Sequence, residues 1–175
     1  MKNIILTGYM GCGKTTVGQR LAERIGYVFA DTDGLIEKEQ GRSISDIFAQ
    51  DGEQTFRAME TALLNKALCD GKDGLVIATG GGLPVRAENR ELIKRLGTVV
   101  YLRVKPETVY ERVKGDTSRP LLQCENPLER IKGMLLQRSP AYETADFIID
   151  ADSLSPEEAA AEIEECLKWK GSAKS

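Results

Sequence analysis

The chain has 175 residues, of which 41% are apolar and 29% are charged, and its formal net charge is −3. This balance predicts one globular domain over residues 1–175, with no general attraction to nucleic acid or to an anionic membrane surface, and we expect neither as a partner. Because the sequence contains no histidine, zinc-hydrolase and Ser-His chemistry are excluded.

Four cysteines are scattered along the chain without a CxxC pair, namely Cys12, Cys69, Cys124 and Cys166. The first apolar run, residues 4–6, is too short for a secretory or membrane-spanning segment. We therefore expect a cytoplasmic protein whose thiols are free. Cys12 lies beside Lys14, which favours a reactive thiolate, although a small, buried and unreactive thiol is the alternative.

Short apolar strands alternate with amphipathic helices throughout the chain. Strands are expected at residues 3–7, 27–31, 74–79, 98–103 and 147–150. Most are continuous apolar runs, which are typical of parallel strands covered on both faces. Helices are expected at residues 15–25, 35–39, 45–51, 53–69, 86–96, 107–113, 127–137 and 156–168. The order predicts an α/β three-layer sandwich, with helices on both faces of a five-stranded parallel sheet.

Two stretches lack the apolar pattern of a core. Residues 31–57 insert polar helices between the second and third expected strands, where a turn and one helix would suffice. Residues 115–126 are polar, carry Arg119 and lie between two expected helices. Long segments of this kind often carry function, although a plain surface loop is the alternative for each.

A phosphate-binding loop is predicted at residues 8–15, whose sequence GYMGCGKT matches G-x-x-x-x-G-K-[ST] in full. The motif follows an apolar strand and opens a helix, which is the context it requires. Its glycines let backbone N–H groups wrap a phosphate, Lys14 supplies positive charge, and the Thr15 hydroxyl is a hard ligand for Mg²⁺. The candidate nucleotide-binding residues here are Gly11, Cys12, Gly13, Lys14, Thr15 and Thr16.

The carboxylates of this site are expected after the second strand. The more usual position, after the third strand, reads TGGG at residues 79–82 and has no acid. Asp31 and Asp33 instead follow the second strand, in the ligand crevice of a parallel sheet. One such carboxylate can hold a magnesium-bound water while the other faces an acceptor hydroxyl. A pair of turn or cap aspartates is the alternative.

A nucleotide-dependent switch protein is the rival from another class. Residues 31–34 match the short D-x-x-G pattern, but they follow Lys14 too closely for a switch segment of the usual kind. The guanine-specific N-K-x-D pattern is also missing, because residues 65–68 read NKAL. A non-catalytic nucleotide sensor stays as a remote alternative.

Seven ordered segments carry a family resemblance: residues 8–11 (GYMG), 31–33 (DTD), 41–48 (GRSISDIF), 52–60 (GEQTFRAME), 79–82 (TGGG), 118–122 (SRPLL) and 138–142 (RSPAY). With these segments, the chain resembles the shikimate kinase family along nearly its whole length. The resemblance implies a P-loop fold with a substrate-binding insertion at about residues 32–60 and a lid at about residues 112–126.

The resemblance also implies roles for particular residues. The expected catalytic residues are Lys14, Asp33 and Arg119. The expected acceptor-binding residues are Asp33, Arg57, Gly80, Gly81, Gly82 and Arg138, with both arginines on the shikimate carboxylate and Glu60 orienting an arginine. Arg119 is expected on the ATP phosphates, and Arg112 and Pro156 at the adenine. Magnesium is expected at Thr15 and, through water, at Asp31.

The activity implied is transfer of the γ-phosphoryl group of ATP to the 3-hydroxyl of shikimate. The products would be shikimate 3-phosphate and ADP, in aromatic amino-acid biosynthesis by way of chorismate. The resemblance implies a monomer that uses Mg²⁺ and binds ATP or ADP and shikimate. Another small-molecule P-loop kinase, acting on gluconate or a nucleoside monophosphate, is the alternative.

Overall fold

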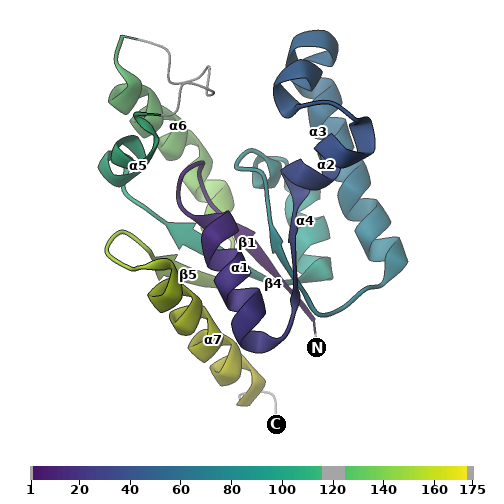
Figure 1. The fold of residues 1–175 in the computed structure, drawn as a ribbon, viewed down its shortest axis with the longest axis vertical. Helices are drawn as coiled ribbons and strands as arrows, with labels where there is room; N and C mark the ends of the chain where they lie inside the picture. The colour runs from purple at the N-terminus through teal and green to yellow at the C-terminus, as the bar shows by residue number, and fades with distance from the viewer. Residues whose placement is uncertain (1, 116–124, 173–175) are drawn as a thin grey trace.

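The computed structural model describes residues 2–115 and 125–172 (Figure 1). Its strands are β1 (Asn3–Thr7), β2 (Val28–Asp31), β3 (Leu75–Ala78), β4 (Gly97–Arg103) and β5 (Phe147–Asp150). Its helices are α1 (Lys14–Ile25), α2 (Thr32–Gln40), α3 (Ile44–Asp70), the 3₁₀ turn η1 (Leu83–Val85), α4 (Ala87–Leu96), α5 (Pro106–Val113), α6 (Pro127–Tyr142) and α7 (Pro156–Ser172).

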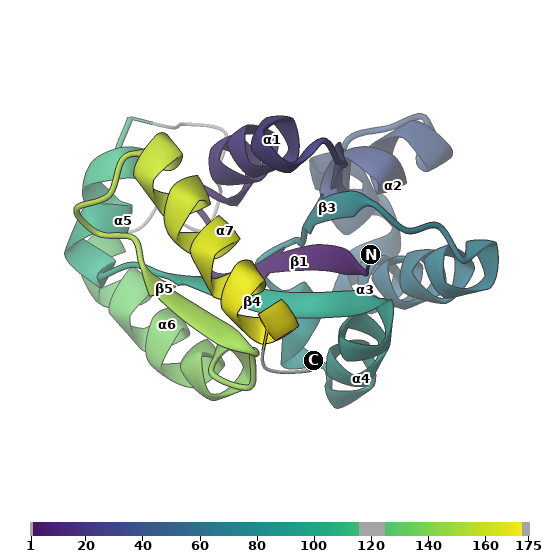
Figure 2. The ribbon, with the colours of Figure 1, turned by 90° about the horizontal axis from the view of Figure 1, so that it is seen from below.

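The strands form a parallel sheet in the order β2-β3-β1-β4-β5. Figure 2 shows this sheet between α1 and α7 on one side and α4 and α6 on the other. The predicted three-layer α/β/α sandwich is therefore confirmed. Within the described ranges, no helix combines the length and the apolar character needed to cross a membrane.

The apolar strand pattern follows from this double cover. Along β1, Ile4 and Leu6 belong to the apolar cluster under α1 and α7, whereas Ile5 belongs to the cluster with α4. All three side chains are at most 3% exposed. A continuous apolar run is thus what a central parallel strand requires, because successive side chains enter opposite layers.

Parallel pairing brings the carboxyl ends of β1, β2 and β3 to one edge of the sheet. Ala78 on β3 pairs with Leu6 on one side and with Asp31 on the other. The segments that begin at Gly8, Thr32 and Thr79 therefore start next to one another. This edge is where open α/β sheets bind their ligands.

Helices α2 and α3 pack on each other around a small core of their own, formed by Ile36, Ile47 and Phe56. Two helices were expected over residues 45–51 and 53–69, and they join end to end as α3 with a kink at Gly52. The φ of Gly52 is 81°, a left-handed conformation that glycine adopts without strain. The pair of helices stands beside the sheet edge (Figure 1).

Helix α6 is longer than predicted and ends at Tyr142 instead of residue 137. Proline usually ends a helix because it lacks an N–H group, but Pro140 lies in the last turn, where only one backbone hydrogen bond is lost. The Ser139 hydroxyl also donates to the Leu135 carbonyl at 2.6 Å. Arg138 and Tyr142 consequently lie one turn apart on the same side of a helix.

Candidate active site

The predicted phosphate loop connects β1 to α1. Gly8, Gly11 and Gly13 have φ angles of 144°, 71° and 99°, which other residues adopt only with strain. A Cβ atom at Gly8 would lie 2.8 Å from both the Cys12 sulfur and the Leu102 carbonyl oxygen. The glycine positions of the motif therefore have a physical cause, and the loop leads into the N-terminus of α1, where backbone N–H groups favour an anion.

The Lys14 side chain folds back onto this loop and contacts its backbone. Its ammonium group donates to the carbonyl oxygens of Gly8 and Tyr9, at 2.8 and 2.9 Å, and lies 3.6 Å from the Cys12 sulfur. Cys12 is 2% exposed and packs in the main apolar cluster. This burial favours the interpretation of Cys12 as a packed thiol that reagents reach poorly.

Thr15 and Asp31 face each other across the cleft, and the Thr15 hydroxyl lies 3.1 Å from Asp31 Oδ2. The other Asp31 oxygen accepts from the backbone N–H groups of Asp33 and Gly34, and so caps α2. The cap interpretation of Asp31 is therefore confirmed, and its role at magnesium stays a prediction. Within the described ranges, no cluster of three or more acidic, cysteine or histidine side chains could hold a metal. The two hard oxygens suit Mg²⁺ as partners of a nucleotide phosphate.

Asp33 lies in the first turn of α2. Burial raises the pKa of its carboxyl group and the nearby Asp31 raises it further, whereas Lys14 and Arg57 oppose the shift. Among the described residues, Asp33 Oδ1 is buried without a hydrogen-bond partner. A buried, unpaired carboxylate oxygen with a raised pKa is what an acceptor for a substrate hydroxyl proton requires.

Arg57 is fixed by two glutamates on its own helix. Its guanidinium donates to Glu60 at 2.8 Å and to Glu53 at 3.0 and 3.3 Å. Because a guanidinium has five N–H groups, these three bonds leave two available for a ligand. The contact of Glu60 with an arginine was expected from the resemblance. Glu53 was missed, although its spacing of four residues from Arg57 is that of a helical ion pair.

Glu60 is fully buried, and burial raises the pKa of its carboxyl group to about 7, against the opposing effect of Arg57. Among the described residues, its Oε1 atom has no hydrogen-bond partner. Gly80 lies against this carboxyl and against Asp33. A Cβ atom there would come within 3.0 Å of Glu60 Oε1 and 2.5 Å of Asp33 Oδ1. The two unpaired oxygens thus meet at the third strand's loop.

The glycine triplet at residues 80–82 closes this part of the cleft. The Gly80 N–H donates to the Thr32 hydroxyl at 2.9 Å, and the Gly81 carbonyl accepts from the Tyr142 hydroxyl at 2.5 Å. The Arg57 guanidinium lies directly against the Cα of Gly82, where a Cβ atom would overlap it. Within the described ranges, the N–H groups of Gly81 and Gly82 make no hydrogen bond.

Arg138 approaches from α6, on the other side of the glycine triplet. Its guanidinium carbon lies 5.8 Å from the centre of the Tyr9 ring, which follows the first glycine of the phosphate loop. No carboxylate among the described residues forms an ion pair with it. Its charge is therefore available to an anionic ligand.

Arg112 on α5 lies on the far side of the phosphate loop. Its guanidinium donates to the carbonyl oxygens of Cys12 and Ala151, each at 3.3 Å. A hollow of about 260 Å³ lies beside it, lined by Gly11, Cys12, Gly13, Thr16, Val17, Arg112, Ala151, Leu154, Pro156 and Ala159. The structure thus brings the two residues expected at the adenine, Arg112 and Pro156, into one hollow. Arg119 falls outside the described residues, as does most of the expected lid.

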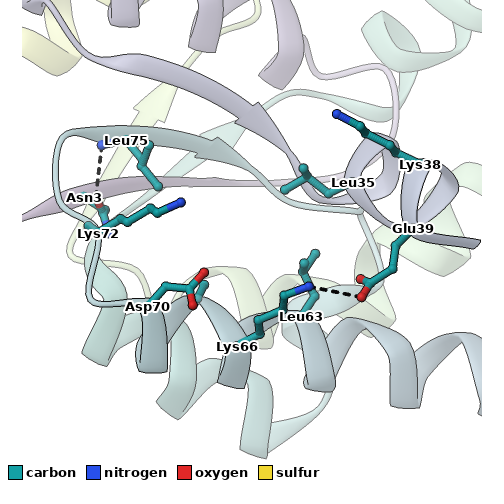
Figure 3. Close-up of a pocket in the computed structure, with 10 residues that line it drawn as sticks. Asn3, Leu35, Lys38, Glu39, Leu63, Lys66, Asp70, Lys72 and Leu75 are labelled. Atoms are coloured by element: carbon teal, nitrogen blue, oxygen red, sulfur yellow. Dashed lines mark hydrogen bonds and ion pairs between the residues drawn. The ribbon is translucent and has the colours of Figure 1, made fainter.

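One cleft of about 390 Å³ joins the phosphate loop to the carboxylates, with Met10, Gly11, Gly13, Lys14, Thr15, Thr16, Asp31, Asp33, Thr79, Gly80, Gly81, Arg112 and Val113 as its lining. A larger hollow of about 450 Å³ lies between α2 and α3 (Figure 3). Asn3 and Leu75 line it, at the amino ends of β1 and β3. It is therefore at the wrong end of the sheet for a nucleotide and is separate from the candidate site.

A parallel sheet, a phosphate loop and a cleft that holds carboxylates and arginines define the class of P-loop phosphotransferases. A family model described as "Shikimate kinase" matches residues 10–168. A shikimate kinase of Thermodesulfovibrio yellowstonii is 48% identical over 163 residues, which cover 93% of each chain. Another, of Symbiobacterium thermophilum, is 45% identical over 172 residues, which cover 97% of this chain and 98% of that one.

A solved structure agrees with these relatives. Shikimate kinase from Acinetobacter baumannii, in complex with shikimate, superimposes with a TM-score of 0.90 at 41% identity. The match covers 97% of this chain and 94% of that one. The chain belongs to the shikimate kinase family.

Proposed function

We propose that this protein transfers the γ-phosphoryl group of ATP to the 3-hydroxyl of shikimate and releases shikimate 3-phosphate and ADP. The observation that carries the proposal is the single cleft in which Lys14 and Thr15 lie beside Asp33 and Gly80. A phosphate-binding loop next to a carboxyl with a buried oxygen that has no hydrogen-bond partner among the described residues is the arrangement that phosphoryl transfer to an alcohol requires. In this role the enzyme serves aromatic amino-acid biosynthesis.

The nucleotide occupies the phosphate loop and the hollow beside Arg112. The N–H groups of the loop and the Lys14 ammonium bind the phosphates, and Arg112 and Pro156 flank the adenine. Arg119, from the lid at about residues 112–126, adds positive charge at the transferred group. Catalysis then rests mainly on positioning and charge neutralisation, as is general for phosphoryl transfer.

Thr15 and Asp31 are the residues that would hold Mg²⁺, the hydroxyl directly and the carboxylate through water. Their oxygens are hard donors and already face each other at 3.1 Å. When bound, the ion supplies positive charge to the nucleotide phosphates. Asp31 keeps its second oxygen on the α2 cap, which holds the carboxylate in place.

The acceptor lies between α3, the glycine triplet and α6. Arg57 and Arg138 bind the shikimate carboxylate, because a guanidinium pairs with a carboxylate through two parallel hydrogen bonds. The N–H groups of Gly81 and Gly82 bind ring hydroxyls. Asp33 takes the proton of the 3-hydroxyl while that oxygen bonds to the γ-phosphorus, and the bond from phosphorus to the ADP oxygen breaks. The insertion at about residues 32–60 supplies Asp33 and Arg57.

The protein is proposed to act as a monomer in the cytoplasm. The substrate assignment is tested by measuring ADP release from Mg·ATP with shikimate, gluconate or AMP as the acceptor. Of the three acceptors, only shikimate should stimulate ADP release. Mass spectrometry of the shikimate product should find one phosphoryl group, on the 3-oxygen. Stimulation by gluconate or AMP, without stimulation by shikimate, would assign the cleft to the alternative kinases.

A further inference from the structure

Tyr142 is the last residue of α6 and is 1% exposed. Its hydroxyl donates to the Gly81 carbonyl oxygen at 2.5 Å. Burial raises the pKa of this phenol well above its ordinary value, although Arg138 opposes the shift. The group therefore stays protonated and remains a donor across the working range of an enzyme. A buried side chain at the end of one helix thus holds the backbone of a loop 61 residues earlier.

The peptide that receives this bond is the one between Gly81 and Gly82. A trans peptide is planar, and its C=O and N–H groups point in opposite directions. The structure has no cis peptide among its described residues. A hydrogen bond that fixes the Gly81 carbonyl therefore also fixes the Gly82 N–H, which points away from Tyr142. This is one of the two N–H groups in the triplet that form no hydrogen bond with the described residues.

Tyr142 is linked to the acceptor arginines in two ways. Arg138 lies one turn before it on α6, and the Arg57 guanidinium rests on the Cα of Gly82, at the other end of the fixed peptide. A Cβ atom at Gly81 would approach the Met10 nitrogen to 3.3 Å, so the triplet also leans on the phosphate loop. Because a glycine backbone can adopt many conformations, contacts from other segments are needed to hold the triplet in one conformation.

We propose that Tyr142 is a positioning residue for the acceptor: its hydroxyl sets the orientation of the peptide between Gly81 and Gly82, and thereby the donor that this peptide presents to a ring hydroxyl of shikimate. The inference rests on the proposed function, because it places shikimate at the triplet. It assigns to Tyr142 no contact with the reacting atoms.

The test is the Tyr142→Phe variant, which keeps the ring and removes the hydroxyl. The matched control is Tyr101→Phe, because the two rings pack with centroids 5.1 Å apart and Tyr101 is also buried, at 2% exposure. Within the described part of the chain, no hydrogen bond of the Tyr101 hydroxyl is found, and burial raises the pKa of this phenol to about 12. Both variants should fold, as checked by circular dichroism and thermal melting, because neither leaves a large void.

Loss of one neutral hydrogen bond should raise the KM for shikimate roughly 3- to 10-fold in Tyr142→Phe and leave the KM for ATP within about twofold of its original value. Tyr101→Phe should change neither constant. An unchanged shikimate KM in Tyr142→Phe would overturn the inference. So would equal increases in both KM values, or the same increase in Tyr101→Phe, since these are effects of general loosening.

Two further measurements separate this inference from the proposed function. The unaltered enzyme must phosphorylate shikimate, and Arg57→Ala must raise the KM for shikimate by roughly 10- to 200-fold, as expected for a charge-assisted hydrogen bond. If either result is not obtained, the proposal that shikimate binds in this cleft is rejected. Success of both, with no effect in Tyr142→Phe, rejects the role of Tyr142 alone.

Discussion

The phosphate end and the acceptor end of the cleft are built in different ways. At the phosphate end, one uninterrupted segment, residues 8–15, supplies the backbone cradle, Lys14 and Thr15. At the acceptor end, four separate segments meet: the start of α2, the middle of α3, the glycine triplet and the end of α6. The first site depends on local backbone conformation, and the second on how helices pack.

This difference explains where each end is sensitive. A contiguous loop keeps its geometry as long as its glycines keep their φ angles, so its chemistry is compact and local. The acceptor end must instead be held by contacts between segments, such as the hydrogen bond from the Gly80 N–H to the Thr32 hydroxyl and that from the Tyr142 hydroxyl to the Gly81 carbonyl. Substitutions in segments that are far apart in the sequence are therefore expected to alter binding of the acceptor.

The largest effect is expected for Asp33, and comparing it with Asp31 tests whether the acceptor end and the phosphate end have separate roles. Asp33→Asn removes the proposed proton acceptor and should lower kcat by roughly 10²- to 10⁴-fold. Binding of ADP, measured by calorimetry, should be unchanged. Asp31→Asn keeps the α2 cap, because asparagine caps a helix as well as aspartate does. It should show mainly a raised Mg²⁺ requirement for turnover. An equal dependence on Mg²⁺ in both variants would contradict separate roles.

The same contrast sets how much the sequence could predict. The strand, loop and helix around residues 8–15 were predicted in full, because the motif is local and each residue type has its own physical cause. Arg57, Arg138 and the triplet were reached only through the family resemblance, since nothing in their spacing brings them together. Tyr142 was quoted only within the segment at residues 138–142, without a role of its own, because the expected helix ended at residue 137 and did not reach it.

Some outcomes needed the tertiary structure itself. The sequence did not predict that Asp33 and Glu60 lie close to Gly80. Their approach depends on how α2 and α3 pack against the loop that follows β3. The raised pKa of Glu60 likewise comes from burial. Burial of a charged helical residue is not expected from the sequence, because such residues are mostly exposed.

The second prediction tests whether the acceptor end depends on close packing. A Cβ atom at Gly80 would press on Asp33 and Glu60, so Gly80→Ala should lower kcat/KM for shikimate roughly 10- to 100-fold, with ATP affinity kept. Gly34→Ala is the matched control on α2, because nothing lies within 4 Å of its Cβ position. That variant should keep full activity and gain up to about 1 kcal/mol of stability. Similar losses in both variants would refute a packing cause.

The last prediction concerns the stability of the acceptor end, through the titration of Glu60, and its expected effect is on folding and not on catalysis. Its pKa is about 7 in the folded protein, against an ordinary value of 4.5, so the folded state binds the proton more tightly than the unfolded state does. The contribution of Glu60 to the free energy of unfolding should therefore be fully present below pH 4.5 and should be lost as the pH rises through about 7, by up to about 3 kcal/mol.

Urea unfolding at pH 5 and pH 7.5 measures this slope, and Glu60→Gln, which cannot ionise, should make the loss between these two pH values smaller. Glu53→Gln is the matched control, because Glu53 also pairs with Arg57 but its side chain is 64% exposed. It should keep the pH dependence of the unaltered protein, since a solvated carboxylate has little burial cost to recover. The opposite result would contradict the prediction. If Glu53→Gln removed the pH dependence of the unfolding free energy and Glu60→Gln did not, the responsible carboxyl would be the exposed Glu53 and not the buried Glu60.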